Sequence, residues 1–297
     1  MYSLVISLFK LILTGALLIS VLGGCSVQHQ LLNRAGDLLS AESSSTDDDL
    51  ELLMHASAYQ LKLSESLLQK IPDHIKLAEA VTRGYTQYAF VFLMDEADRA
   101  ESESIQIATK LRIRATNILL RAKSHGLQTL SLNNPNLTTY LSLHNSNQSP
   151  TIKPDQSGLG YWTVAAWAGA ISLSKDNPDV VADLPQVLRL ADLIWKSNPQ
   201  FDNGSLASLM GTLEMAKPSG QSAVAERYFN QAIQWRNGQP GPLVSKAENW
   251  AVPAQDKVAF TSLLNQAILD AQGKKDVASL VMLRRAHWLL SCTDDLF

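Results

Sequence analysis

Cys25 is the residue whose surroundings most clearly indicate chemistry. It follows Leu22 and two glycines, at the end of an apolar run from Leu4 to Val21. Small residues before a cleavage point are typical of a signal peptide, because the peptidase must accommodate the chain there. The pattern resembles a bacterial lipobox, in which the cysteine becomes the first residue and its thiol carries diacylglycerol. We therefore expect a lipoprotein signal peptide over residues 1–24 and lipidation of Cys25.

An uncleaved membrane anchor is the alternative, because the apolar run is long enough for a spanning helix. Lys10 lies inside this run rather than ahead of it, which is atypical of a signal peptide. Either way, residues 26–297 are exported. Ser26 stands where an aspartate would favour the inner membrane, so we expect a lipid-anchored protein that faces the periplasm, at the outer rather than the inner membrane.

The remaining candidates for catalysis form no known motif. The six histidines are scattered, without an H-E-x-x-H pair, and no G-x-S-x-G, P-loop or dinucleotide fingerprint is present. Glu96, Asp98 and Arg99 lie close together, but they are most simply interpreted as a solvated helix end. After acylation of Cys25, Cys292 has no cysteine with which to pair. We therefore expect no enzymatic activity, no bound metal and no cofactor.

Two aromatic segments indicate a binding cavity. Tyr85, Tyr88 and Phe92 recur at helical spacing in one segment. Trp162 and Trp167 belong to a second segment, whose other residues are mostly small. Aromatic rings with polar tips suit the wall of a cavity for a hydrophobic small molecule. Packing in the protein core is the alternative for all five side chains.

The composition agrees with a helical domain that has a packed core. Loss of residues 1–24 removes only Lys10, so the formal charge changes from −3 to −4. This value gives no reason to expect nucleic acid as a partner. We divide the chain into the signal peptide, an anchor and linker over residues 25–45, and a single domain over residues 46–297.

Apolar residues recur with helical period almost throughout the domain, and no segment alternates long enough to predict a strand. We therefore predict an all-α fold of antiparallel helix pairs. Pro72 and Gly126 are among the residues that end helices, and residues 131–158 form a loop with one short helical piece. The predicted helices cover approximately residues 50–71, 75–97, 104–123, 160–174, 179–197, 204–216, 220–236, 255–272 and 276–291.

Two short sequence segments with the same residue spacing indicate a repeat. Ala225, Phe229 and Ala232 have the spacing of the second helix of a tetratricopeptide unit, in which small residues let two helices approach. Phe260, Leu264 and Ala267 repeat this spacing 35 residues later, and one such unit has about 34 residues. We predict a tetratricopeptide-like array, with a generic helical bundle as the alternative.

Several segments together resemble the TatT lipoproteins, the T components associated with TRAP transporters. They occur in the family's order, and the resemblance covers nearly all of the mature chain. The segments are GYTQYAF from Gly84, DEADR from Asp95, YWTVAAW from Tyr161, ISLSKDNP from Ile171, EMAKP from Glu214 and RRAHWLL from Arg284. The stretch 144–158 is longer than this resemblance leads us to expect. Cys25 is the position that we transfer from the family.

The resemblance implies an accessory scaffold of a TRAP-type uptake system. Its implied partner is a periplasmic solute-binding protein of the TRAP type, and its implied ligand is a hydrophobic or organic-acid-like small molecule. A scaffold lipoprotein for envelope or outer-membrane assembly is the alternative. The sequence leaves open whether copies of the chain form a homo-oligomer.

Overall fold

The computed structural model describes residues 29–41, 49–143 and 149–297. Cys25 and the predicted signal peptide lie outside these ranges. Helices dominate the described residues, and no strand occurs among them, which confirms the predicted all-α class. None of the helices in these ranges is long and apolar enough to cross a membrane.

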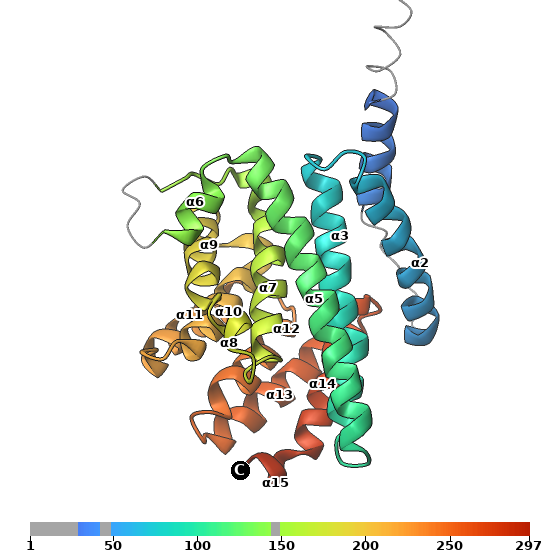
Figure 1. Ribbon diagram of the computed structural model, residues 1–297. Helices are drawn as coiled ribbons and strands as arrows, with labels where there is room; N and C mark the ends of the chain where they lie inside the picture. Colours follow the sequence, from blue (N-terminus) through green and yellow to red (C-terminus); the bar gives the residue numbers. More distant parts are fainter. Residues whose placement is uncertain (1–28, 42–48, 144–148) are drawn as a thin grey trace, which may run out of the picture.

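The first half of the structure is built on long helices that run up and down beside one another (Figure 1). A helix over residues 29–40, which we call the N-terminal helix, precedes them. Asp49 then caps the next helix by accepting the amides of Glu51 and Leu52 at 3.1 and 3.0 Å. The elements that follow are α2 (Leu50–Leu68), α3 (Ile75–Tyr88), the π-helical segment η1 (Ala89–Met94), α4 (Asp95–Ala100) and α5 (Ile105–Asn133).

Shorter helices complete the fold. The middle of the chain forms α6 (Leu137–Ser142), the 3-10 turn η2 (Pro154–Gln156), α7 (Ser157–Ser172), α8 (Pro178–Val181), α9 (Leu184–Ser197) and α10 (Phe201–Ala216). The C-terminal part forms α11 (Ser222–Trp235), α12 (Gly241–Lys246), the π-helical segment η3 (Ala247–Ala251), α13 (Lys257–Ala271), α14 (Val277–Ser291) and α15 (Thr293–Leu296).

The helix predicted over residues 104–123 is longer than expected. It continues through Gly126 as α5, so the prediction that this glycine ends the helix is wrong. A Cβ atom at Gly126 would collide with the hydroxyl of Thr163 in α7. The glycine therefore lets α5 and α7 approach closely, and this packing offsets the low helix propensity of glycine.

The segment between Pro240 and Val252 also differs from the prediction. No helix is predicted between residues 236 and 255, yet α12 and η3 occupy part of this segment. Pro242 lies in the first turn of α12, where a proline removes no hydrogen bond from the helix.

The residues of the predicted repeat are all fully buried. They are Ala225, Phe229, Ala232, Phe260, Leu264 and Ala267. A Cβ atom at Gly211 of α10 would lie 2.8 Å from the ring of Phe229, so this ring fills the gap between α10 and α11. The burial agrees with the expected packing, while the assignment to tetratricopeptide units stays a prediction.

Two clusters of buried apolar side chains lie within the described residues. The larger one extends from α2 to α10, and the smaller one joins η3 to α12, α13 and α14. Close packing of α10 against α11 connects the two halves; a Cβ atom at Gly204 would lie 2.7 Å from the carbonyl oxygen of Ala232. The residues Asp202, Asn203 and Gly204 have φ of 48°, 50° and 95°, so a left-handed stretch precedes the regular part of α10.

Candidate functional site

The five aromatic side chains predicted to line a cavity lie on three helical elements, α3, η1 and α7. Tyr85 and Tyr88 of α3 and Trp167 of α7 are buried, whereas Phe92 of η1 and Trp162 of α7 are half-buried. The rings of Tyr88 and Phe92 meet edge to face at 5.4 Å. The ring of Trp162 instead contacts Tyr161, at 4.9 Å between ring centroids. The two hollows described below are lined by other residues, so a cavity at these aromatics stays a prediction.

Trp167 is held by polar contacts as well as by packing. Its indole N–H donates to Asp183 at 2.8 Å, and Lys123 lies 4.1 Å from the ring centroid. Lys123 also pairs with Asp183 at 2.8 Å. These contacts join α5, α7 and the start of α9, and they fix the orientation of the indole ring.

A buried carboxylate lies beside Tyr85. Glu65 of α2 is 1% exposed and accepts from Lys62 at 2.5 Å and from His125 at 2.6 Å. Arg121 of α5 also donates to both of its oxygens. Burial by itself would raise the pKa of Glu65, but hydrogen bonds from Lys62, Arg121 and His125 lower it to about 2. Burial and the charge of Glu65 raise the pKa of Tyr85 to about 12. This cluster therefore joins α2 to α5 around a carboxylate that is charged at neutral pH.

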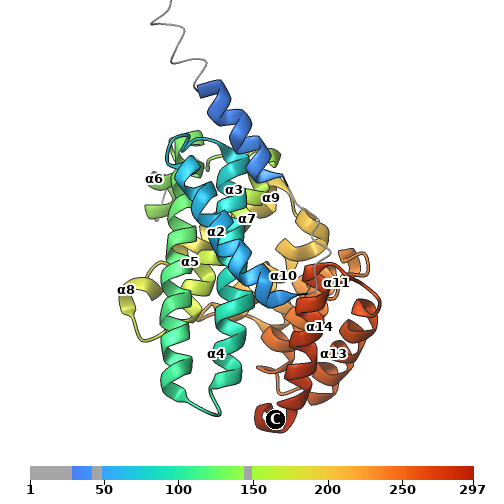
Figure 2. The ribbon, with the colours of Figure 1, turned by 90° about the vertical axis from the view of Figure 1, so that its right-hand side faces the viewer.

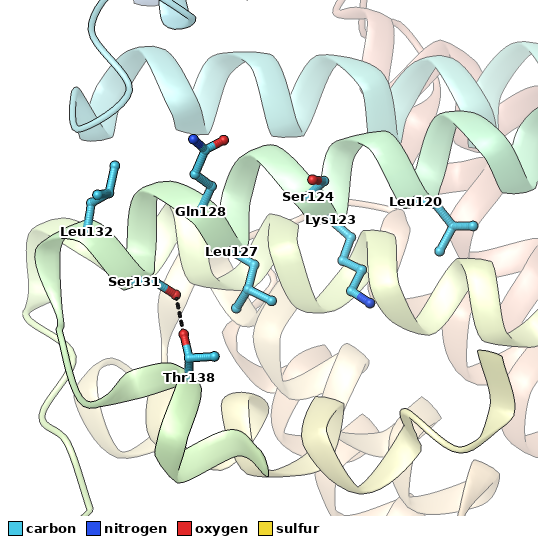
Figure 3. A pocket seen from close by; sticks show the side chains of 8 residues that line it. All are labelled: Leu120, Lys123, Ser124, Leu127, Gln128, Ser131, Leu132 and Thr138. Atoms are coloured by element: carbon cyan, nitrogen blue, oxygen red, sulfur yellow. Dashed lines mark hydrogen bonds between the residues drawn. The ribbon is translucent and has the colours of Figure 1, made fainter. Parts of the chain in front are cut away.

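A hollow of about 650 Å³ runs along α5 beside α6 (Figure 3). We call it the α5 groove; its lining residues are Leu120, Lys123, Ser124, Leu127, Gln128, Ser131, Leu132 and Thr138. Figure 3 shows Leu120, Lys123 and Leu127 projecting to the side on which Thr138 lies, and the Ser131 and Thr138 hydroxyls are 3.0 Å apart. The only ionisable lining group is Lys123, which pairs with Asp183. The α5 groove is therefore lined mainly by leucines and by uncharged polar side chains.

A second hollow, of about 520 Å³, lies where α4 faces α14. Its apolar lining includes Val252, Leu289 and Leu296, with the half-buried thiol of Cys292 beside them. Four arginines and four carboxylates meet at this cleft. We call them the arginine–carboxylate cluster; they are Asp95, Asp98, Arg99, Glu101, Arg112, Glu248, Arg284 and Arg285.

Arg285 is the centre of the arginine–carboxylate cluster. Its Nη1 donates to Asp98 at 2.9 Å, and its Nη2 donates to Glu248 at 2.6 Å. Arg112 donates to the other oxygen of Asp98 at 3.1 Å, so Asp98 is shared by two arginines. Burial raises the pKa of Glu248 although Arg285 opposes this. Elements that lie far apart in the sequence are therefore joined by charged hydrogen bonds.

Trp288 adds an aromatic surface to the same cleft. The guanidinium of Arg285 lies 4.4 Å from its ring centroid, and that of Arg99 lies 5.9 Å away. Arg99 belongs to α4 and Trp288 to α14, so this cation–π contact also crosses the cleft.

Both π-helical segments of the described chain adjoin the arginine–carboxylate cluster. The segment η1 ends directly before Asp95, and η3 contains Glu248. Such segments occur often at functional sites, since the extra residue in the turn redirects the side chains that follow. Within the described ranges, no group of three or more histidine, cysteine or carboxylate side chains is arranged to hold a metal ion. The cleft is thus equipped for polar contact.

The arginine–carboxylate cluster was not predicted from the sequence. Asp98 and Arg99 were interpreted as a solvated helix end, whereas Asp98 pairs with Arg285, 187 residues away. The adjacent arginines at positions 284 and 285, before Trp288, were a usable signal, because two cations and an aromatic ring on one helix face require partners.

Comparison with known proteins identifies a family and a relative. The family model TAtT, TRAP transporter T-component, matches residues 46–297. An uncharacterized protein of Treponema pallidum (strain Nichols) is 24% identical over 266 residues, which cover 84% of this chain and 81% of that protein.

Proposed function

Because the chain belongs to the TRAP transporter T-component family, we propose that it works with a TRAP-type periplasmic solute-binding protein, as a lipid-anchored accessory scaffold. Membership itself assigns an accessory role in a TRAP transport system, in the periplasm or envelope. The main support for the proposal is the extent of the match to the family model, because residues 46–297 include every helix from α2 to the C-terminus.

The anchor is a part of this proposal that can be tested by itself. Cleavage after Gly24 leaves Cys25 as the first residue, and its lipid holds the chain at the outer membrane, facing the periplasm. Cys25→Ser should give unprocessed or soluble protein, because no acyl chain can then be attached. Mass spectrometry of the membrane-bound protein measures this directly, and an unmodified Cys25 in the mature chain contradicts it.

The α5 groove is the surface that we assign to the solute-binding protein. Leu120, Leu127 and Leu132 give it an apolar wall, and its hydroxyl and amide groups offer hydrogen bonds without fixed charge. Apolar centres with polar edges are typical of protein interfaces. The lack of a catalytic arrangement in the groove agrees with a role in contact.

The test is a direct binding measurement with a TRAP-type solute-binding protein from the same organism. Leu132→Asp places a charge at one end of the groove and should weaken binding by at least about tenfold, because a charge on an apolar interface residue loses its water on binding. Val258→Asp is the matched control, because Val258 is an exposed apolar residue on α13, outside the groove. Equal affinity of both variants would remove the groove from the interface.

Absence of binding to the solute-binding protein at micromolar concentration would overturn the transport proposal itself. Co-purification from envelopes then separates the alternatives: recovery of outer-membrane assembly proteins, without the solute-binding protein, would support the assembly scaffold instead.

A further inference from the structure

The two helices nearest to the N-terminus expose large apolar side chains. We define the N-terminal apolar face by five residues that are between 47% and 78% exposed: Leu31, Leu38, Leu52, Tyr59 and Leu63. Leu31 and Leu38 are two turns apart on the N-terminal helix, and the other three residues lie on α2. Spacings of seven and four residues place each set on one side of its helix.

These five residues stay exposed because other apolar residues of the same two helices make the contacts with the core. Leu32 and Leu39 of the N-terminal helix already contact the core, and a Cβ atom at Gly36 would lie 3.0 Å from Ile71. Leu61 and Leu68 perform the same role in α2. Each helix therefore carries a second apolar stripe that the fold does not use. Figure 2 shows both helices on the side that faces the viewer, with α2 in front of α3 and the N-terminal helix above it.

The position of this face in the chain indicates what covers it. Cys25 precedes residue 29 by four residues, and four extended residues span at most about 14 Å. A lipid on Cys25 therefore keeps the bilayer within reach of the N-terminal helix, an argument that rests on the proposed anchor. The charged side chains on these helices are of both signs, among them Arg34, Asp37 and Lys62. Apolar contact, rather than attraction to anionic lipid, therefore governs the binding.

We propose that the N-terminal apolar face lies on the bilayer that holds the lipid anchor. Leucine side chains enter the boundary between headgroups and acyl chains, and the ring of Tyr59 stays at headgroup level, where amphipathic aromatic side chains accumulate. The helices then provide a second membrane contact beside the acyl chains. Figure 1 shows α6, α9 and α11 on the side opposite to α2, so these helices face the periplasm.

The test measures how deeply single probes enter the bilayer. The full chain is expressed with Cys292→Ala and one new cysteine, Leu31→Cys or Tyr59→Cys, which carries an environment-sensitive fluorophore. The membrane-purified protein is reconstituted in phosphatidylcholine vesicles with or without a spin-labelled lipid quencher. Val258→Cys is the control, because Val258 is 82% exposed on α13. We expect about twofold quenching at positions 31 and 59 and almost none at 258, since interfacial helices bury their apolar faces by about 5–10 Å.

Three results overturn the inference, and they differ from one another. If the probes at 31 and 59 behave like the probe at 258 while mass spectrometry finds the acyl chain on Cys25, the apolar face does not touch lipid and the anchor stands. If Cys25 carries no acyl chain, the mass spectrum shows that the proposed anchor has failed together with the inference. If quenching follows protein density instead of the spin-labelled lipid, a second copy of the chain covers this face.

Discussion

Replacing Arg285 by alanine tests whether the arginine–carboxylate cluster holds the two halves of the molecule together. The side chain of Arg285 is 20% exposed and pairs with Asp98 at 2.9 Å and with Glu248 at 2.6 Å. Removal of one partner from a buried pair costs about 3–5 kcal/mol, whereas an exposed pair contributes about 0–1 kcal/mol. Because these groups are mostly but not fully buried, we expect the free energy of unfolding to fall by about 2 kcal/mol.

Arg284→Ala is the matched control for this experiment. Arg284 lies on the same helix and pairs with Asp95 at 3.1 Å, but its side chain is 49% exposed. Solvent screens such a contact, so this variant should lose less than about 1 kcal/mol. Urea unfolding, followed by circular dichroism and tryptophan fluorescence, compares the two variants. Equal losses would refute the idea that burial makes the contacts of Arg285 stronger than those of Arg284.

A double-mutant cycle with Glu248→Ala isolates the pair itself. If Arg285 stabilises the fold by compensating the buried charge of Glu248, the two substitutions should couple by at least about 1 kcal/mol. Additive losses would mean that Arg285 acts through other contacts, such as its packing against Trp288.

Three further predictions address other parts of the chain. Glu65→Gln should lower the free energy of unfolding by about 3 kcal/mol at neutral pH, because the pKa of Glu65 is lowered to about 2, so that its stabilisation is complete above pH 4.5 and lost as the pH falls toward 2. In urea unfolding between pH 2 and 7, the stability of this variant should depend less on pH than that of the parent protein, whereas Glu103→Gln, an exposed substitution, should leave the pH dependence of stability unchanged. Ala232→Leu should cost about 1–3 kcal/mol, because this fully buried residue contacts Gly204 and has no room for a larger side chain; a thermal melt that matches the parent protein would contradict this. Trp162→Ala should weaken the binding of a hydrophobic fluorescent probe per folded molecule if Trp162 lines a ligand cavity, and unchanged probe affinity in a destabilised protein would instead identify its ring as core.

Helix ends were predictable where the cause is local. Pro72 follows the end of α2, Pro178 is the first residue of α8, and Pro199 lies between α9 and α10. Proline fixes its own backbone and restricts the preceding residue, so the sequence contains the full reason for each break. The buried positions of Ala225 and Phe229 were predictable too, because their spacing defines one face of a helix.

Predictions from the sequence failed where the structure of a residue depends on contacts with residues far away in the chain. Glycine at position 126 has the local properties of a helix end, yet close contact with Thr163 makes it an interior residue of α5. The role of Asp98 depends in the same way on Arg285, a residue on a different helix. No single-sequence rule connects positions 187 residues apart, so the arginine–carboxylate cluster required the structure.

The two halves of the molecule are joined by contacts of opposite physical character. Apolar packing of α10 against α11, with Gly211 beneath Phe229, forms one junction, and ion pairs between α4 and α14 form the other. Salt strengthens apolar burial slightly but screens charge over a Debye length of about 8 Å at physiological ionic strength. Raising the salt concentration should therefore weaken the half-exposed pair of Arg284 with Asp95, while the mostly buried contacts of Arg285 and the α10–α11 junction change little. The cleft is thus the junction of the two halves whose strength depends on charge.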